Sequence, residues 1–218
     1  MLGILCGLES EAKIARQIKG AMVVCAAARP RKARDLAREL VAQGATRLMS
    51  FGIAGSLDSS VFLGDIFVGT RVASAGGQWL CDEAWGRELA GRIPHAKRGS
   101  VYGSKTLIAT IAEKDALHQK TGCAIVDMES QCVAEAAAEA KIPMIVVRAV
   151  CDDCVMNVPP LVLVAVAEDG RINVLRALGH LLCHPLQIVD LLHIARGTNR
   201  ALAALRAIKL LSDCPRSD

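Results

Sequence analysis

Apolar and polar positions along this chain form alternating blocks that match the periods of strands and helices. Apolar runs of strand length cover residues 1–8, 22–27, 47–51, 66–73, 101–102, 123–126 and 144–150. Segments with helical spacing or composition cover residues 9–18, 31–43, 83–90, 108–120, 130–141, 174–182, 186–196 and 199–211. Because strands alternate with helices, the pattern predicts an α/β fold.

The length and composition of the chain predict one domain. A chain of 218 residues can bury an ample core, and 52% of its residues are apolar. Aromatic residues make up only 3%, so Ala, Val, Leu and Ile must fill the interior. No shift in composition and no internal repeat marks a boundary. We therefore expect a single domain over residues 1–218, with a C-terminal helical part at roughly 172–211.

Charge and cysteine usage narrow the functional classes. The net charge is +4, and the basic residues are dispersed without interleaved aromatics, which argues against a nucleic-acid partner. Nine scattered cysteines indicate reduced thiols rather than a disulfide framework. The N-terminal apolar run lacks a basic lead, and the longest apolar run, Val158 to Ala167, is too short to span a bilayer. These features favour a cytoplasmic protein without a transmembrane segment.

Candidate chemistry is concentrated between Cys123 and Asp153. This segment is predicted to form strand, helix and strand, with Asp127 and Glu129 after the first strand and Asp152 after the second. A crossover of this kind makes its two strands parallel, so their acids should emerge at the same edge of the sheet. Ligands of open α/β sheets bind at that edge.

Glycines follow two other predicted strands. Gly7 precedes Glu9 and Glu11, and Gly52-Ile53-Ala54-Gly55 forms a predicted turn after the strand at 47–51. Glycine lets the backbone approach a ligand closely, and exposed amides can bind an anion. The spacing does not match the dinucleotide-binding fingerprint. Taken singly, each feature has a structural explanation: Glu129 can stabilise a helix N-terminus, and Asp152 can be a turn residue.

Taken together, these motifs resemble the nucleoside phosphorylase and nucleosidase family, of the purine nucleoside phosphorylase and methylthioadenosine/S-adenosylhomocysteine nucleosidase type. The resemblance covers roughly residues 1–155 and runs in order through Glu9-Ser-Glu11, the Gly52 motif, Gly64-Asp65, Asp127-Met-Glu129 and Arg148-Ala-Val-Cys-Asp152. It implies an enzyme with a three-layer αβα sandwich around a mixed, mostly parallel sheet. It also implies a small-molecule nucleoside substrate, a homo-oligomer, and no metal or cofactor, with inorganic phosphate as a potential co-substrate.

The resemblance also implies roles for individual residues. Cleavage of an N-ribosyl bond produces a cationic sugar and needs a protonated purine as the leaving group. Asp152 would protonate purine N7, Glu129 would bind the ribose hydroxyls, and Glu11 would activate the attacking water, while Arg148 would orient carboxylates. The substrate-binding residues implied by the family motifs are Met128, Gly52, Ile53, Ala54, Asp127, Thr106, Leu107, Glu9 and Arg29.

Some positions depart from the family pattern. In the family pattern a serine precedes the leaving-group acid and donates a hydrogen bond to it. Here Cys151 replaces that serine, which predicts a weaker hydrogen bond to Asp152. Residues 103–107 lack the aromatic side chain that stacks on the base. Ser50 stands where the phosphorylases have an arginine, which favours water as the nucleophile. Conversely, the segment at residues 28–32 adds cations that could bind phosphate, so hydrolysis and phosphorolysis both remain open.

The tail suggests a substrate. Residues 158–171 and the leucine-rich segment with His184-Pro185 resemble the hopanoid-associated branch of the family, which implies release of adenine from adenosylhopane in hopanoid biosynthesis. Leucines at 161–166 and 181–192 could then form a groove for a lipid tail, and peripheral contact with a membrane would be compatible with it. The same leucines could instead belong to the core or to a dimer interface.

Several alternatives stay open. The chain could be a methylthioadenosine/S-adenosylhomocysteine nucleosidase, a general purine nucleoside phosphorylase, or a non-catalytic nucleoside-binding module of the same fold. A zinc or redox site at Cys151-x-x-Cys154 is disfavoured because the intervening Asp pair opposes thiolate formation. His180 and His184 have helical spacing but no evident third metal ligand.

Overall fold

The computed structural model describes residues 1–159 and 188–208. Four features of the sequence lie outside these ranges: the helix expected at 174–182, the leucines at 161–166, the first part of the leucine-rich segment at 181–192, and the histidines at 180 and 184. What the sequence predicts for these four features therefore stays a prediction.

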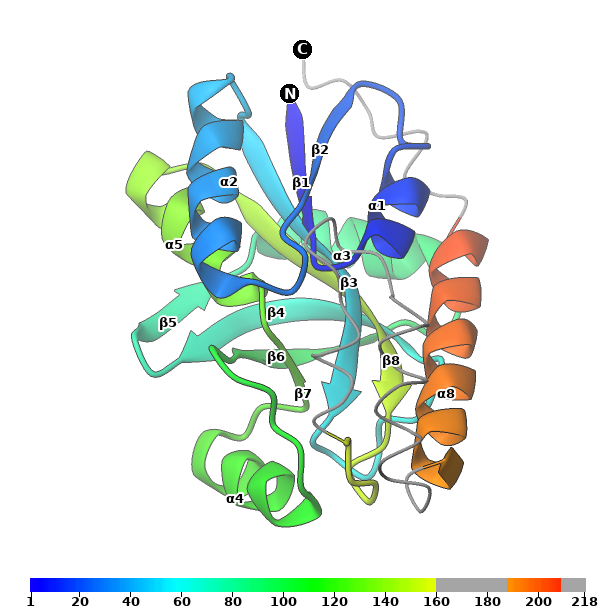
Figure 1. Ribbon diagram of the computed structural model, residues 1–218. Helices are drawn as coiled ribbons and strands as arrows, with labels where there is room; N and C mark the ends of the chain where they lie inside the picture. The colour runs from blue at the N-terminus through cyan, green and yellow to red at the C-terminus, as the bar shows by residue number, and fades with distance from the viewer. Residues whose placement is uncertain (160–187, 209–218) are drawn as a thin grey trace.

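The described residues form strands and helices in alternation (Figure 1). The strands are β1 (Leu2–Cys6), β2 (Ala21–Cys25), β3 (Arg47–Ser56), β4 (Ile66–Ser74), β5 (Gly77–Leu80), β6 (Lys97–Gly103), β7 (Ile125–Asp127) and β8 (Met144–Asp152). The helices are α1 (Glu9–Ala15), α2 (Pro30–Ala42), α3 (Glu83–Arg92), α4 (Ile111–Thr121), α5 (Ser130–Ala140) and α8 (Ile188–Ala207). The sequence missed β5, whose four residues are too few for a periodic signal.

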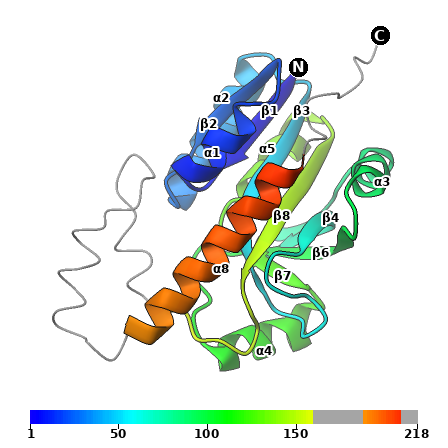
Figure 2. The ribbon, with the colours of Figure 1, turned by 90° about the vertical axis from the view of Figure 1, so that its right-hand side faces the viewer.

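The elements form three layers, as the α/β class predicted. Helices α2 and α5 pack together on one side of the sheet, and α1 and α8 cover the other side (Figures 1 and 2). Most strand pairings are parallel, and β3–β7, β4–β5 and β4–β8 are antiparallel. The fold is therefore the expected αβα sandwich around a mixed, mostly parallel sheet.

The sheet curls back on itself at one end. Strand β3 pairs with β7 and β8, β8 pairs with β4, and β4 continues through β6 to β7. These five strands form a closed ring, from which β1 and β2 extend beside β3 and β5 extends beside β4. The ring brings together chain segments that would lie far apart in a flat sheet.

The predicted turn at Gly52 to Gly55 is wrong, because these residues continue strand β3. Leu48 to Ala54 pair with β8 without interruption, and the register shifts between Ala54 and Gly55. A shift of this kind bends a strand and changes its twist. The glycines here serve close packing rather than a chain reversal.

The expected parallel arrangement of the strands flanking α5 is also wrong. Strand β8 runs parallel to β3, whereas β7 runs antiparallel to β3 and pairs with its last residues, Gly55 and Ser56. The crossover rule applies to parallel strands of one open sheet, and here the bend in β3 carries the sheet around the ring. The acids after β7 and β8 are nevertheless brought together by this bend.

A third difference concerns the C-terminal part. The sequence predicted two helices, 186–196 and 199–211, but α8 is continuous through Gly197. A side chain at Gly197 would overlap the carbonyl oxygen of Cys151 in β8. This glycine therefore lets α8 lie directly on the strand that carries Asp152.

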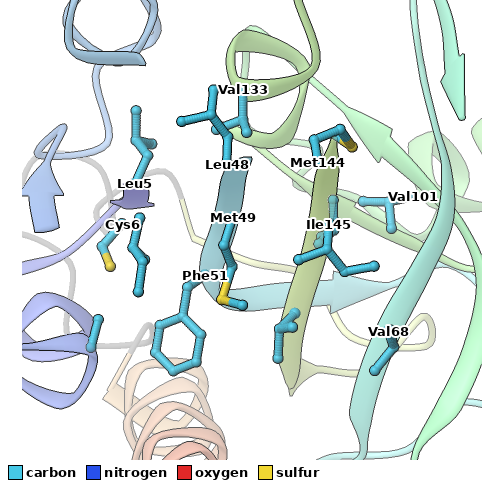
Figure 3. Packing of buried hydrophobic residues seen from close by; sticks show 14 of the residues in the cluster. Leu5, Cys6, Leu48, Met49, Phe51, Val68, Val101, Val133, Met144 and Ile145 are labelled. Carbon is cyan, nitrogen blue, oxygen red and sulfur yellow. The ribbon is translucent and has the colours of Figure 1, made fainter. Parts of the chain in front are cut away.

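The core contains aliphatic side chains and few aromatics, as the composition predicted. Leu5, Leu48, Phe51, Ile145 and other residues of β1, β3 and β8 pack in the centre of the sheet (Figure 3). Burying each large apolar side chain contributes about 1.5–3 kcal/mol. None of the described helices is both long enough and apolar enough to cross a membrane.

The loop after β2 holds two alanines in a strained conformation. Ala27 and Ala28 have φ values of 57° and 53°, in the left-handed region that favours glycine. The loop is fixed against the end of β1, because Ala26 N–H donates to the Cys6 carbonyl (2.8 Å) and Ala28 N–H to the Gly7 carbonyl (2.9 Å). The left-handed region costs a non-glycine residue roughly 1–2 kcal/mol. Strain is thus held next to Gly7 and the start of α1.

Ala28→Gly should therefore raise the free energy of unfolding by about 1 kcal/mol, because glycine adopts this φ without steric cost. The matched control is Ala116→Gly in exposed α4, which should lower it by about 1 kcal/mol. Urea denaturation of both variants measures the difference. A loss of stability in Ala28→Gly would contradict the assignment of strain.

Candidate active site

Three glycines each face one of the three predicted catalytic carboxylates. A Cβ atom on Gly7 would lie 2.7 Å from Glu129 Oε1, one on Gly52 2.6 Å from Glu11 Cδ, and one on Gly55 2.8 Å from Asp152 Oδ2. No side chain fits at such distances, so the backbone just after β1 and that of β3 are in direct contact with the acids. The glycine motifs of the sequence are explained by this close approach.

Arg148 is the centre of the acidic cluster. Its guanidinium is fully buried; Nη2 lies 2.7 Å from Ser50 Oγ and 3.3 Å from Glu129 Oε2. Nε lies 2.7 Å from Asp127 Oδ2, which makes an ion pair, although the N–H does not point at the oxygen as a hydrogen bond requires. The arginine therefore orients carboxylates, as the sequence predicted.

Asp127 fixes the beginning of α5. Its Oδ1 accepts hydrogen bonds from Glu129 N (3.2 Å), Ser130 N (3.0 Å) and Ser130 Oγ (2.7 Å). These bonds satisfy amide groups that the helix itself cannot pair. With Oδ2 beside Arg148, both oxygens of Asp127 have protein partners. The geometry gives this residue a positioning role for Glu129.

Glu11 reaches from α1 to the middle of β3. Oε2 accepts from Gly7 N and Leu8 N, both at 2.8 Å, and Oε1 accepts from Ile53 N at 2.9 Å. Burial raises the pKa of Glu11, while Arg148 and these backbone amides act in the opposite direction. A base with a raised pKa accepts a proton more readily near neutral pH.

Glu129 is a buried carboxyl with a strongly shifted pKa. Burial raises its pKa to about 8, because Arg148 offsets only part of the desolvation and the charges of Asp127 and Glu11 add to it. One guanidinium thus faces three carboxylates. The cluster has an excess of negative charge, and Glu129 retains a proton near neutral pH.

Asp152 lies at the end of β8 with a donor on each oxygen. The Cys151 thiol is 3.2 Å from Oδ1, so the thiol does take the place of the expected serine hydroxyl. Burial and the neighbouring Asp152 raise the pKa of Cys151, which keeps it a thiol and a donor. Oδ2 is 2.5 Å from Lys114 Nζ of α4.

The other predicted site residues are distributed around this cluster. Gly52, Ile53 and Ala54 belong to β3 beside Glu11 and Arg148, and Met128 is partly exposed next to Glu129. Thr106 is exposed and Leu107 half-buried before α4, Arg29 is exposed at the start of α2, and Glu9 forms an ion pair with Arg16 at 2.5 Å. Substrate binding by these residues stays a prediction.

Sequence reasoning missed two residues that touch the site. Ser50 is buried and accepts a hydrogen bond from Arg148, whereas the sequence suggested only that an arginine was missing there. Lys114 is buried against Asp152. A lysine in a helix of mixed composition gives no sequence signal for burial, since lysines are almost always exposed.

Comparison with known proteins agrees with this arrangement. The model of the phosphorylase superfamily matches residues 19–177, which is most of the chain. The chain belongs to the phosphorylase superfamily. The resemblance to nucleoside phosphorylases and nucleosidases is thereby confirmed, as is the prediction of an enzyme. No curated protein sequence matches the chain.

Solved structures of the superfamily share the fold at low identity. A 5'-methylthioadenosine/S-adenosylhomocysteine nucleosidase from Helicobacter pylori, bound to butyl-thio-DADMe-Immucillin-A, is 13% identical with a TM-score of 0.66; the match covers 95% of this chain and 96% of that one. An S-adenosylhomocysteine nucleosidase from Streptococcus pyogenes with 5-methylthiotubericidin is 16% identical with a TM-score of 0.67, and 96% of each chain is covered. Futalosine hydrolase of Helicobacter pylori is 13% identical with a TM-score of 0.67, over 95% of this chain and 96% of that one.

Gly52→Ala should lower the free energy of unfolding by about 1–3 kcal/mol, because the methyl group has no room in this superfamily member's acidic cluster. It would lie 2.5 Å from Arg148 Nη1 and 2.6 Å from Glu11 Cδ, both fully buried. The control is Gly91→Ala in α3, where nothing lies within 4 Å. That substitution should raise stability by up to about 1 kcal/mol. Equal effects in urea denaturation would refute the packing argument.

Stability should fall as the pH rises from about 5 to about 8. The folded-state pKa of Glu129, about 8, lies above its ordinary value of 4.5, so in this window the folded state holds a proton that the unfolded state has released. One such proton gives a slope of at most about 1.4 kcal/mol per pH unit. Glu129→Gln should flatten the slope in urea titrations at several pH values. If the variant keeps the wild-type slope, another group causes the pH dependence of stability.

Proposed function

We propose that this protein cleaves the N-ribosyl bond of a 5'-modified adenosine and releases adenine. The observation that carries the proposal is the set of three carboxylates, Glu11, Glu129 and Asp152, that contact Gly7 and two glycines of β3 in a superfamily member. A module that only bound nucleosides would have no need of buried carboxyls with raised proton affinity.

The three carboxyl groups can act one after another in the cleavage of the N-ribosyl bond. The C1'–N9 bond breaks, its electron pair moves to the purine, and the proton of Asp152 passes to N7. Glu129 would give its proton to solvent when the substrate binds, and its carboxylate would then accept a hydrogen bond from a ribose hydroxyl and stabilise the cationic sugar. Water attacks C1' and gives its proton to Glu11.

Water is the favoured nucleophile. With Glu129 protonated, the carboxylates of Glu11 and Asp127 still exceed the single charge of Arg148, and this excess would repel a phosphate dianion. Ser50 fills the place of an arginine and is itself bound to Arg148. The exposed cation Arg29 at the start of α2 favours the second candidate, phosphorolysis.

We propose further that the 5' substituent is large and apolar, as in adenosylhopane. The support is the resemblance of the tail to the hopanoid-associated branch, together with the exposed Leu192 on α8. The similar nucleosidases point to a smaller substituent, since one was solved with 5'-methylthioadenosine in its active site. Both substrates therefore belong in the same assay.

Asp152→Asn should lower kcat/KM for adenine release at least about a hundredfold, because an amide cannot donate the proton that N7 requires. The assay measures free adenine from adenosylhopane, 5'-methylthioadenosine and adenosine. The matched control is Asp153→Asn, the neighbouring carboxyl, which should behave as wild type. Undiminished release by Asp152→Asn would refute the catalytic assignment.

The same assay separates the nucleophiles and the substrates. Release without phosphate, with a ribose that keeps its 5' substituent as the sugar product, supports hydrolysis. The corresponding 5'-substituted ribose 1-phosphate, formed only with phosphate, would establish phosphorolysis instead. A preference for 5'-methylthioadenosine over adenosylhopane would refute the lipid substrate while leaving the reaction class intact.

A further inference from the structure

Helix α4 has an unusual buried residue. Within the described structure, the only residue of this helix that is buried is Lys114, whose exposed fraction is 0%. The helix shows no apolar face: Ile111 is exposed, and Leu117 is only half-buried. A capping box of Thr110 and Glu113 begins it, so its formation is local. Leu117 packs against the small apolar cluster that contains Leu57 and Val126, and the fully buried Lys114 is a further attachment of α4 to the rest of the fold.

All three donors of the Lys114 ammonium have partners near the end of β8. Nζ lies 2.5 Å from Asp152 Oδ2, 2.7 Å from the Asp153 carbonyl oxygen and 3.1 Å from the Met156 carbonyl oxygen. An ammonium has three N–H groups, so no donor is left over. The ammonium is thus fully used in contacts with the end of β8 and the loop that follows it.

Two further bonds connect the same segments. Val158 N–H donates to the Ala109 carbonyl at 2.7 Å, and Ile111 N–H donates to Asn157 Oδ1 at 3.0 Å. Helix α4 lies at one end of the molecule in both views, beside the ends of β7 and β8 (Figures 1 and 2). Of these contacts between α4 and the end of β8, the one made by Lys114 reaches the carboxyl group of Asp152 itself.

The carboxyl group of Asp152 has donors from two elements. From α4 it receives the Lys114 ammonium, and from its own strand the Cys151 thiol, while Gly55 of β3 lies against it. Donors therefore occupy both oxygens. One cation faces one carboxylate, in contrast to the three carboxylates around Arg148.

We propose that Lys114 is the positioning residue of the leaving-group acid, an inference that rests on the proposed function. It holds Asp152 as a carboxylate in the free enzyme, and Asp152 takes a proton from solvent when a purine enters. During cleavage this proton moves from Asp152 to N7 while the C1'–N9 electron pair moves to the purine. The carboxylate that results is again stabilised by Lys114, so the cation makes Asp152 a stronger acid in the step that matters.

The test is the pH profile of adenine release. In Lys114→Met the alkaline limb of kcat/KM should move up by about one pH unit or more, because the acid keeps its proton longer. The plateau of kcat at low pH should fall about tenfold, because the acid is weaker. Lys114→Arg keeps the charge and should retain the wild-type alkaline limb. Lys120→Met, an exposed lysine of the same helix, should leave the whole profile unchanged.

A carboxyl ¹³C NMR titration gives a readout that does not depend on activity. The Asp152 signal is identified by its loss in Asp152→Asn, and in free wild type at pH 7 it should be that of a carboxylate. A protonated signal there overturns the proposal even if Lys114→Met does not fold. An unmoved alkaline limb in an active Lys114→Met overturns it as well. Absence of adenine release by wild type, with the carboxylate signal present, would instead refute the proposed function.

Discussion

The buried guanidinium of Arg148 is the interaction on which the rest of the site depends. It lies in the middle of β8, and two other segments of the chain reach it: the β7–α5 junction with Asp127 and Glu129, and β3 with Ser50. Burying a charge costs several kcal/mol unless partners compensate it, and a single removed partner leaves an uncompensated charge. The pKa of Arg148 stays above its ordinary value: burial lowers it, but Asp127, Glu129 and Glu11 raise it further. The arginine therefore keeps its charge under all conditions in which the protein folds.

The glycines make this convergence sterically feasible. Side chains normally keep strands and helices several ångströms apart, but Gly7, Gly52 and Gly55 let carboxylates contact the backbone directly, just after β1 and in β3. The amides of Gly7 and Ile53 then donate to Glu11, so the same close approach that removes side chains supplies hydrogen bonds. The bend in β3 completes the arrangement, since it places β7 and its acids within reach of β8. The glycines and the bend in β3 therefore determine both the path of the sheet and the arrangement of the site.

The sequence predicted the elements well and their geometry less well, for identifiable reasons. Hydrophobic periodicity is local, so β1, α2 and β8 were found, and motif order led to the correct family. Glycine has two physical uses, turning the chain and admitting a close neighbour, and the pattern around Gly52 or Gly197 does not distinguish them. The direction of β7 depends on a bend elsewhere in the chain. Lys114 was missed because its burial depends on an acid 38 positions away.

The two acids that would act on the substrate are set in opposite electrostatic environments. Glu129 shares one cation with two other carboxylates, and its pKa of about 8 leaves it protonated in the free protein at neutral pH. Among the described residues, Asp152 is the carboxylate that forms an ion pair with Lys114. The proposed reaction requires the reverse distribution: an anion beside the cationic sugar and a proton beside the purine. Under the proposed mechanism, substrate binding must therefore move one proton off Glu129 and one onto Asp152. Because these changes offset each other, the site can reach its reactive state without a net change in charge, which avoids the cost of adding a charge to a buried cluster.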